Sequence, residues 1–220
     1  MFASKRLTHA VLTGMALWLF SSAHASAAVL DFEGLADFTP VTNQYAGLGV
    51  TFQNATAGVI PPDGTLNEID FPPTSGTTLI TNEIDLDNDG FPDVTGPMTI
   101  TFTPYPYLNV GGYFTYADFG QSGDPLTLSA FGPGDPLNPL ATLTLFENLG
   151  SPQLLSFSGI GPISSLLASG GQGSNFTLDN FTFTGRFAPG GSLVPEPSSL
   201  IFLTLGLAAL GMGSRLKSNR

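Results

Sequence analysis

The stretch "LTLSAFGPGDPLNPLATLTLF" (residues 126–146) decides the fold class. In its first part Leu126, Leu128 and Ala130 alternate with polar residues, so in an extended chain they lie on one face. Glycine and proline interrupt the pattern, and "LTLF" then repeats it. A period of two is typical of a half-buried β-strand. The stretch therefore predicts two strands joined by a turn.

The same pattern recurs through the middle of the chain. "TITFT" (residues 99–103) places Ile100 and Phe102 on one face, and "FTLDNFTFT" (residues 176–184) repeats the alternation. The 27 glycines and 18 prolines interrupt these runs and argue against long helices. Roughly ten short strands at this spacing predict an all-β, jelly-roll-like β-sandwich over residues 28–186.

The N-terminal residues have the three parts of a secretory signal peptide. Lys5 and Arg6 supply positive charge, an apolar run follows from Ala10 to Phe20, and small residues follow that run. The apolar run is too short to span a bilayer alone. We expect an N-terminal signal helix within a signal peptide of residues 1–27; the alternative is an anchor or a buried helix.

The charge distribution excludes several classes of function. The chain has six Lys+Arg against 17 Asp+Glu, and between residues 29 and 194 the one basic residue is Arg186. Both histidines lie in the first 25 residues, and cysteine is absent. Nucleic-acid binding lacks its phosphate-neutralising cations, and imidazole- or thiolate-based catalysis and zinc binding lack their side chains. Carboxylate chemistry and hard-cation binding remain.

The segment "DLDNDGFPD" (residues 85–93) is the clearest chemical motif. Carboxylates at alternate positions followed by glycine suit a calcium loop, because calcium takes six to eight oxygen ligands and glycine permits the sharp turn. The glutamate expected at the end of an EF-hand loop is replaced by Gly96. The alternative is a solvated acidic turn. The expected ligands are Asp85, Asp87, Asp89, the carbonyl oxygen of Phe91, and Asp93.

A weaker acidic cluster joins the two ends of the predicted domain. Jelly-roll carbohydrate-binding modules often hold a structural calcium between their first and last strands. By this fold-level analogy, the candidate ligands are Glu33, Asp179 and Asn180. The alternative is that these are charged and polar groups on edge strands.

Four tyrosines gather in "PYPYLNVGGYFTY" (residues 104–116). Aromatic faces stack on sugars, because the ring has an apolar body and the hydroxyl is polar. The alternative, which the alternation of the strand favours, is a cross-strand ladder of tyrosine and phenylalanine. The candidate sugar-binding residues are Tyr105, Tyr107, Tyr113 and Tyr116.

The C-terminus has three parts in a fixed order. A linker of residues 187–194 precedes Pro195-Glu196-Pro197, an apolar run covers residues 198–214, and Arg215, Lys217 and Arg220 close the chain. The apolar run predicts a single transmembrane helix at the short limit for a bilayer, with its basic end retained in the cytoplasm. The alternative is a simple C-terminal anchor.

In this combination, residues 195–220 resemble the PEP-CTERM sorting signal. The resemblance implies recognition by an exosortase-type membrane transpeptidase in a Gram-negative, exopolysaccharide-producing bacterium. It implies an exported protein of the cell envelope, cell surface or extracellular space that is anchored in the membrane until it is processed. The body is loosely similar to secreted β-sandwich proteins with this signal, on "DFEGL", "NQYAGLGVTF" and "NFTLDNFTFTG".

These observations together predict a non-catalytic surface or extracellular-matrix protein. Its body is expected to bind carbohydrate, with exopolysaccharide as the partner, and calcium. One alternative is a carbohydrate-active enzyme that uses paired carboxylates. The other is an ice-binding-type adhesion protein, for which the threonines of "TITFT" and "FTLDNFTFT" are the hint.

Overall fold

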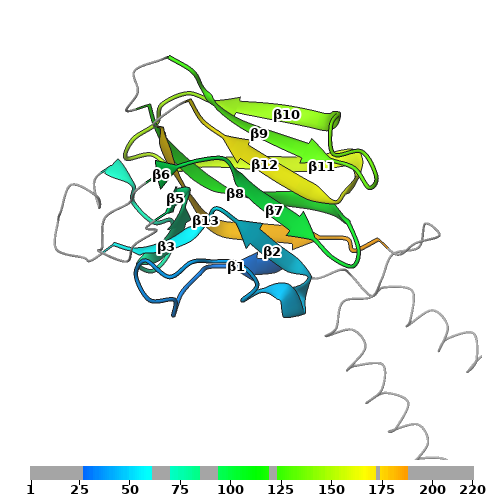
Figure 1. The fold of residues 1–220 in the computed structure, drawn as a ribbon, viewed down its shortest axis with the longest axis horizontal. Helices are drawn as coiled ribbons and strands as arrows, with labels where there is room; N and C mark the ends of the chain where they lie inside the picture. The colour runs from blue at the N-terminus through cyan, green and yellow to red at the C-terminus, as the bar shows by residue number, and fades with distance from the viewer. Residues whose placement is uncertain (1–26, 61–69, 85–93, 119–122, 172–173, 188–220) are drawn as a thin grey trace, which may run out of the picture. The chain divides into compact units, whose positions relative to one another are not determined.

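The computed structural model describes residues 27–60, 70–84, 94–118, 123–171 and 174–187. Residues 27–194 form one compact unit built on two antiparallel sheets (Figure 1). Its hydrophobic core is a single cluster with side chains from both sheets. The prediction of an all-β body is confirmed.

The larger sheet has the strand order β11–β8–β13–β4–β3, and β1 also pairs with β13. Its strands are β1 (Ala28–Leu30), β3 (Thr56–Val59), β4 (Thr78–Thr81), β8 (Tyr107–Ala117), β11 (Gln153–Ile163) and β13 (Asn175–Thr184). The second sheet has the order β10–β9–β12–β7–β2. Its strands are β2 (Val50–Gln53), β7 (Met98–Phe102), β9 (Leu126–Phe131), β10 (Pro139–Leu145) and β12 (Ser165–Ser169). A short ribbon of β5 (Glu83–Ile84) with β6 (Val94–Thr95) and the 3-10 turn η1 (Ala46–Leu48) complete the described elements.

The opening stretch of the sequence forms the β9–β10 hairpin. Leu143 lies opposite Leu128, and Thr142 lies opposite Ser129. Along β9 the buried and half-buried positions alternate strictly, as the period of two requires. The turn is held by Asp135, whose carboxylate accepts hydrogen bonds from the backbone N–H groups of Leu137 and Asn138. The predicted strand–turn–strand is therefore confirmed.

Strand β13 lies at the centre of the larger sheet and changes its partner halfway along. It pairs with β8 on one side. On the other side it pairs first with β4, through Thr177 and Leu178, and then with β1, through Phe181 to Phe183. The register shifts between Asp179 and Thr182, and Asn180 has φ 47°. This irregularity turns the Asp179 side chain toward the segment that precedes β4.

Several predicted segments lie outside the described residues: residues 1–26 of the signal peptide, the tail of residues 195–220, and the acidic loop of residues 85–93. Within the part of the chain that the structure does describe, no helix has the length and apolar character needed to cross a membrane.

Candidate functional site

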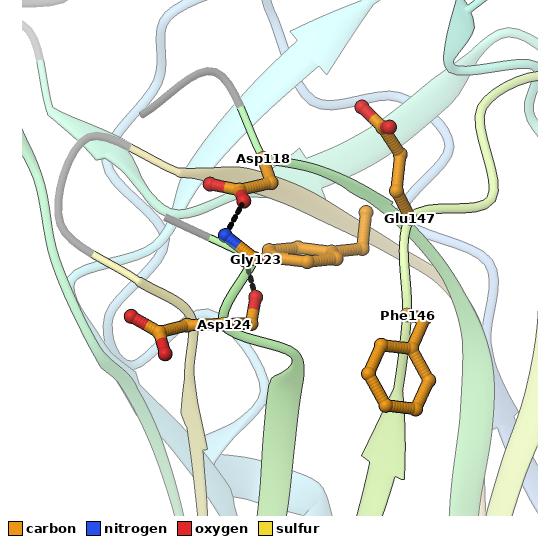
Figure 2. A pocket seen from close by; sticks show the side chains of 6 residues that line it. Asp118, Gly123, Asp124, Phe146 and Glu147 are labelled. Atoms are coloured by element: carbon orange, nitrogen blue, oxygen red, sulfur yellow. Dashed lines mark hydrogen bonds between the residues drawn. The ribbon is translucent and has the colours of Figure 1, made fainter. Parts of the chain in front are cut away.

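A pocket of about 400 Å³ lies where β8 ends, β9 begins and β10 ends. Its lining residues are Tyr116, Asp118, Gly123, Asp124, Phe146 and Glu147. Figure 2 shows Asp118, Gly123 and Asp124 on one side, and Phe146 and Glu147 on the other. The volume is in the range of pockets that hold small ligands.

One wall is built on the buried side chain of Tyr116. Its hydroxyl donates to the carbonyl oxygen of Asp124 at 2.6 Å and lies 3.0 Å from the Ser174 hydroxyl. The Asp118 carboxylate accepts the backbone N–H of Gly123 at 2.7 Å and the Ser174 hydroxyl at 3.3 Å. These bonds fix the two carboxylate-bearing segments against the end of β8.

The opposite wall is fixed by Asn148. Its side-chain oxygen accepts the backbone N–H of Tyr116 at 2.7 Å, and its amide donates to the carbonyl oxygens of Phe114 and Ser151. The backbone N–H of Asn148 also donates to the carbonyl oxygen of Tyr116. The two preceding residues, Phe146 and Glu147, are therefore held beside the end of β8 although both side chains are exposed.

The chemistry of the pocket combines acceptors with an apolar ring. Asp118, Asp124 and Glu147 supply carboxylate oxygens, and the Phe146 ring is 68% exposed. Carboxylates accept hydrogen bonds from hydroxyl groups, and an exposed ring offers a face for the apolar side of a ligand. The lining holds no cation, histidine or thiol. The pocket therefore suits a neutral, hydroxyl-rich ligand better than an anionic one.

The four predicted tyrosines fall into two pairs. Tyr107 and Tyr116 are 1% and 0% exposed, and their hydroxyls donate to the carbonyl oxygens of Leu48 and Asp124. Their rings pack in the core, which is the cross-strand alternative that the sequence favoured. Tyr105 and Tyr113 are half-buried, so a sugar-stacking role stays a prediction for these two.

Tyr105 also contributes to a cation–π contact. The guanidinium of Arg186 lies 5.8 Å from the ring centroids of Tyr105 and Tyr107, and it donates to the carbonyl oxygen of Leu48 at 3.2 Å. Arg186 thereby holds the end of the last strand against the loop before β8. The one cation of the body has a structural role here.

The structure brings Glu33, Asp179 and Asn180 to the same segment. The Asp179 carboxylate accepts the backbone N–H groups of Thr74 at 2.7 Å and Ser75 at 2.9 Å. Glu33 accepts those of Thr77 and Thr78, each at 2.9 Å. The Asn180 side-chain oxygen accepts the Ser75 hydroxyl at 3.0 Å. The carboxylate pair Glu33–Asp179 thus holds residues 74–78.

In this arrangement Glu33 and Asp179 hold the segment through hydrogen bonds, and a calcium ion bound by them stays a prediction. Calcium is coordinated by oxygen atoms, whereas the carboxylates here face N–H donors. Burial raises the pKa of the Asp179 carboxyl above its usual value, and the charge of Glu33 raises it further, against the opposing effect of the backbone hydrogen bonds. Within the described ranges, no three His, Cys, Asp or Glu side chains are grouped to hold a metal.

The candidate ligands Asp85, Asp87, Asp89, Phe91 and Asp93 lie outside the described residues, so the calcium loop stays a prediction. Sequence reasoning missed the pocket residues. The sequence did contain a sign that Phe146 is exposed. Leu143 and Leu145 alternate toward the core, and Phe146, the residue after Leu145, therefore points to the other face. Nothing in the sequence indicated that Asp118 and Glu147 lie at the same pocket.

Comparison with protein families decides the nature of the tail. Residues 193–217 match the model described as the PEP-CTERM protein-sorting motif. The chain carries a PEP-CTERM sorting motif. The resemblance that the sequence predicted is confirmed for the tail, and a PEP-CTERM motif marks an exported protein. No curated protein matches this chain in sequence.

Among solved structures, the PEP-CTERM protein's body is similar to adhesin and carbohydrate-binding domains. The K1 adhesin domain of Lys-gingipain from Porphyromonas gingivalis W83 is 11% identical, with a TM-score of 0.43 over 72% of this chain and 97% of that chain. The K2 adhesin domain of Lys-gingipain is 9% identical, with a TM-score of 0.39 over 72% and 99%. TmCBM61, solved with β-1,4-galactotriose, is 10% identical, with a TM-score of 0.38 over 69% and 99%. With TM-scores this low, these likenesses do not indicate what this chain binds.

Proposed function

We propose that this chain is a non-catalytic bacterial surface or extracellular-matrix protein whose tail is processed by an exosortase-type membrane transpeptidase. The sorting motif at residues 193–217 is the observation that carries the proposal. In this scheme the signal peptide starts export, and the apolar run of residues 198–214 holds the chain in the membrane until processing. The folded body of residues 27–194 is then released to the surface.

We infer a jelly-roll topology for the body. The strand order supports it: β4–β13–β8–β11 in one sheet faces β7–β12–β9–β10 in the other. The chain passes between the sheets in the order of two Greek keys, and β1, β2 and β3 are additions to these eight strands. Loops then gather at the ends of the sandwich, and the pocket lies among such loops.

We further propose that the pocket binds a neutral carbohydrate. Sugar hydroxyls would donate to the carboxylates of Asp118, Asp124 and Glu147, and the exposed Phe146 ring would lie against the apolar face of a sugar ring. Exopolysaccharide of the producing cell is the proposed source of this ligand. Calcium, proposed for the loop of residues 85–93, would stabilise the body and is not needed at the pocket.

A glycan-array screen with the purified body of residues 27–194 tests the pocket. We expect binding to neutral glycans that is lost in Phe146→Ala and weakened in Glu147→Gln, and kept in Leu48→Ala, which removes an exposed apolar side chain elsewhere. Failure of the parent body to bind any glycan would contradict the proposal, as would equal binding by all three variants. Hydrolysis of a bound glycan would favour the carboxylate-dependent enzyme instead.

A further inference from the structure

The end strands β2, β3 and β11 are protected, at least in part, against pairing with another strand. The loop of residues 37–45 covers β2 and β3. Phe52 N–H donates to the carbonyl oxygen of Thr42, and Phe38 N–H donates to that of Ala57. Strand β11 is protected differently, because its pairing shifts register after Ser158, at two glycines with positive φ. Such irregularities bend an edge away from a partner.

From Ala141 onward, the edge of β10 lacks these protections. It is the end strand of its sheet and pairs only with β9 within the described residues. Apart from the ladder with β9, the backbone groups of residues 141–145 make no hydrogen bond to any other described segment. Pro139 and a register shift between Pro139 and Ala141 protect only the start of this seven-residue strand. The remaining N–H and C=O groups of the free edge are a template for a further antiparallel strand.

Exposed apolar side chains lie on and near this edge. Leu137 is 85% exposed, Leu140 43% and Leu149 37%, and Leu154 at the start of β11 is 53% exposed. Strands β10 and β11 lie near each other on one side of the sandwich (Figure 1). Exposed apolar residues that gather beside an open edge mark an interaction surface.

The charge of the chain indicates what covers this edge. The chain carries a net charge of −11, yet residues 136–146 and 148–178 contain no charged side chain. Two copies of an acidic molecule repel one another over most of their surfaces, and a neutral strand is where they approach at least electrostatic cost. An antiparallel pair of identical strands is self-complementary under two-fold symmetry.

We propose that the body forms a symmetric dimer in which β10 pairs antiparallel with β10 of a second copy, joining the two five-stranded sheets into one. A standard interface buries about 800 Å² per partner, and one strand edge with a few leucines offers less. The dimer is therefore weak and dependent on concentration. Because like charges oppose it, the dimer fraction rises with salt.

Sedimentation velocity on the purified body of residues 27–194 tests this surface. We expect a monomer–dimer equilibrium that shifts to monomer in Thr142→Glu, because each copy then brings a new carboxylate to the paired strands of an already acidic molecule. The matched control is Thr101→Glu, which makes the same change on the central strand β7 and should leave the dimer intact. Leu140→Ser, which adds no charge, should weaken the dimer, and circular dichroism checks that each variant is folded.

A parent body that stays monomeric at all concentrations would overturn the proposal. So would a dimer that persists in folded Thr142→Glu, or one that is lost equally in Thr101→Glu. A dimer that weakens with added salt would show that charge pairing holds the copies together, and would overturn it as well.

Discussion

At the scale of single residues, the carboxylate pair Glu33–Asp179 links the two ends of the body through residues 74–78. Glu33 follows β1 and Asp179 lies in the irregular part of β13, and both accept backbone N–H groups of residues 74–78. Hydrogen bonds to charged groups contribute about 1.5–3 kcal/mol each. The sequence analogy paired these residues correctly but could not show their partners, because residues 74–78 carry no motif.

A substitution at Gly76 should disturb the hydrogen bonds of the Glu33 carboxylate. A Cβ at Gly76 would meet the Glu33 carboxylate, whereas a Cβ at Gly34 would meet nothing, and both glycines have positive φ. Gly34→Ala should therefore lower the free energy of unfolding only by the backbone strain, about 1–2 kcal/mol. Gly76→Ala should lose in addition the Glu33 hydrogen bonds, about 1–3 kcal/mol more.

Urea denaturation of the two glycine variants, beside the parent body, measures this difference. Equal losses in both variants would mean that Glu33 moves aside without cost and that its bonds to Thr77 and Thr78 contribute little.

The pH dependence of stability tests the environment of Asp179. Its pKa is raised, chiefly by burial, so the folded state holds the proton more tightly than the unfolded state. The stability from this group is present below the usual pKa of about 4 and is lost as pH rises through the raised value. The stability of the parent relative to Asp179→Asn should therefore be greater at pH 4 than at pH 7.

Asp135→Asn supplies a control of the opposite sign. The pKa of Asp135 is lowered, first by the Asn138 side-chain hydrogen bond, so its contribution is present at neutral pH and lost as pH falls. Urea denaturation at both pH values measures the two variants, and a parent advantage over Asp179→Asn that grows toward pH 7 would contradict the assignment.

At the scale of elements, the alternation of apolar residues predicted strands wherever one face of the strand is buried. β7 and β9 follow it at every residue, and the hairpin from residue 126 was predicted from it. The pattern predicted β13 as a strand but did not show that its polar positions are buried as well: Thr177 and Asp179 are buried, and Asp179 accepts backbone N–H groups of residues 74 and 75. An alternating pattern shows that one face of a strand is buried, but it does not show whether other residues also bury the opposite face.

The loop between β5 and β6 carries the second test at this scale. If residues 85–93 bind calcium, the ion stabilises the folded state by RT ln(1 + [L]/Kd), about 2.7 kcal/mol at a hundredfold excess over Kd. The triple variant Asp85→Asn, Asp87→Asn, Asp89→Asn should lose the calcium-dependent rise in melting temperature, while Asp135→Asn keeps it. A parent body whose melting temperature ignores calcium would show a solvated acidic turn.

At the scale of the whole molecule, the proposed functions divide between the body and the tail. The tail motif was predictable from sequence because order, composition and position at the end of the chain define it. The pocket was not, because Asp118, Asp124 and Glu147 come from loops that only the packing of two sheets brings together. The tail could thus be predicted from a short local motif, whereas the pocket could be found only from the three-dimensional structure.

The covalent distance between body and motif is short. The last described residue is Phe187, whose N–H donates to the carbonyl oxygen of Pro106, and seven residues separate it from Pro195. At about 3.5 Å per extended residue, the chain reaches on the order of 25–30 Å. In the proposed function, the chain is therefore cut within this reach of Phe187.

Intact mass spectrometry of the mature protein from its native host tests the central claim most directly. The account predicts a chain without residues 1–27, cut near Pro195-Glu196-Pro197, and therefore without the apolar run and Arg215, Lys217 and Arg220. Replacing Glu196 with alanine should cause the unprocessed tail to accumulate in the membrane fraction. A mature, surface-located protein that still ends at Arg220 would contradict the account.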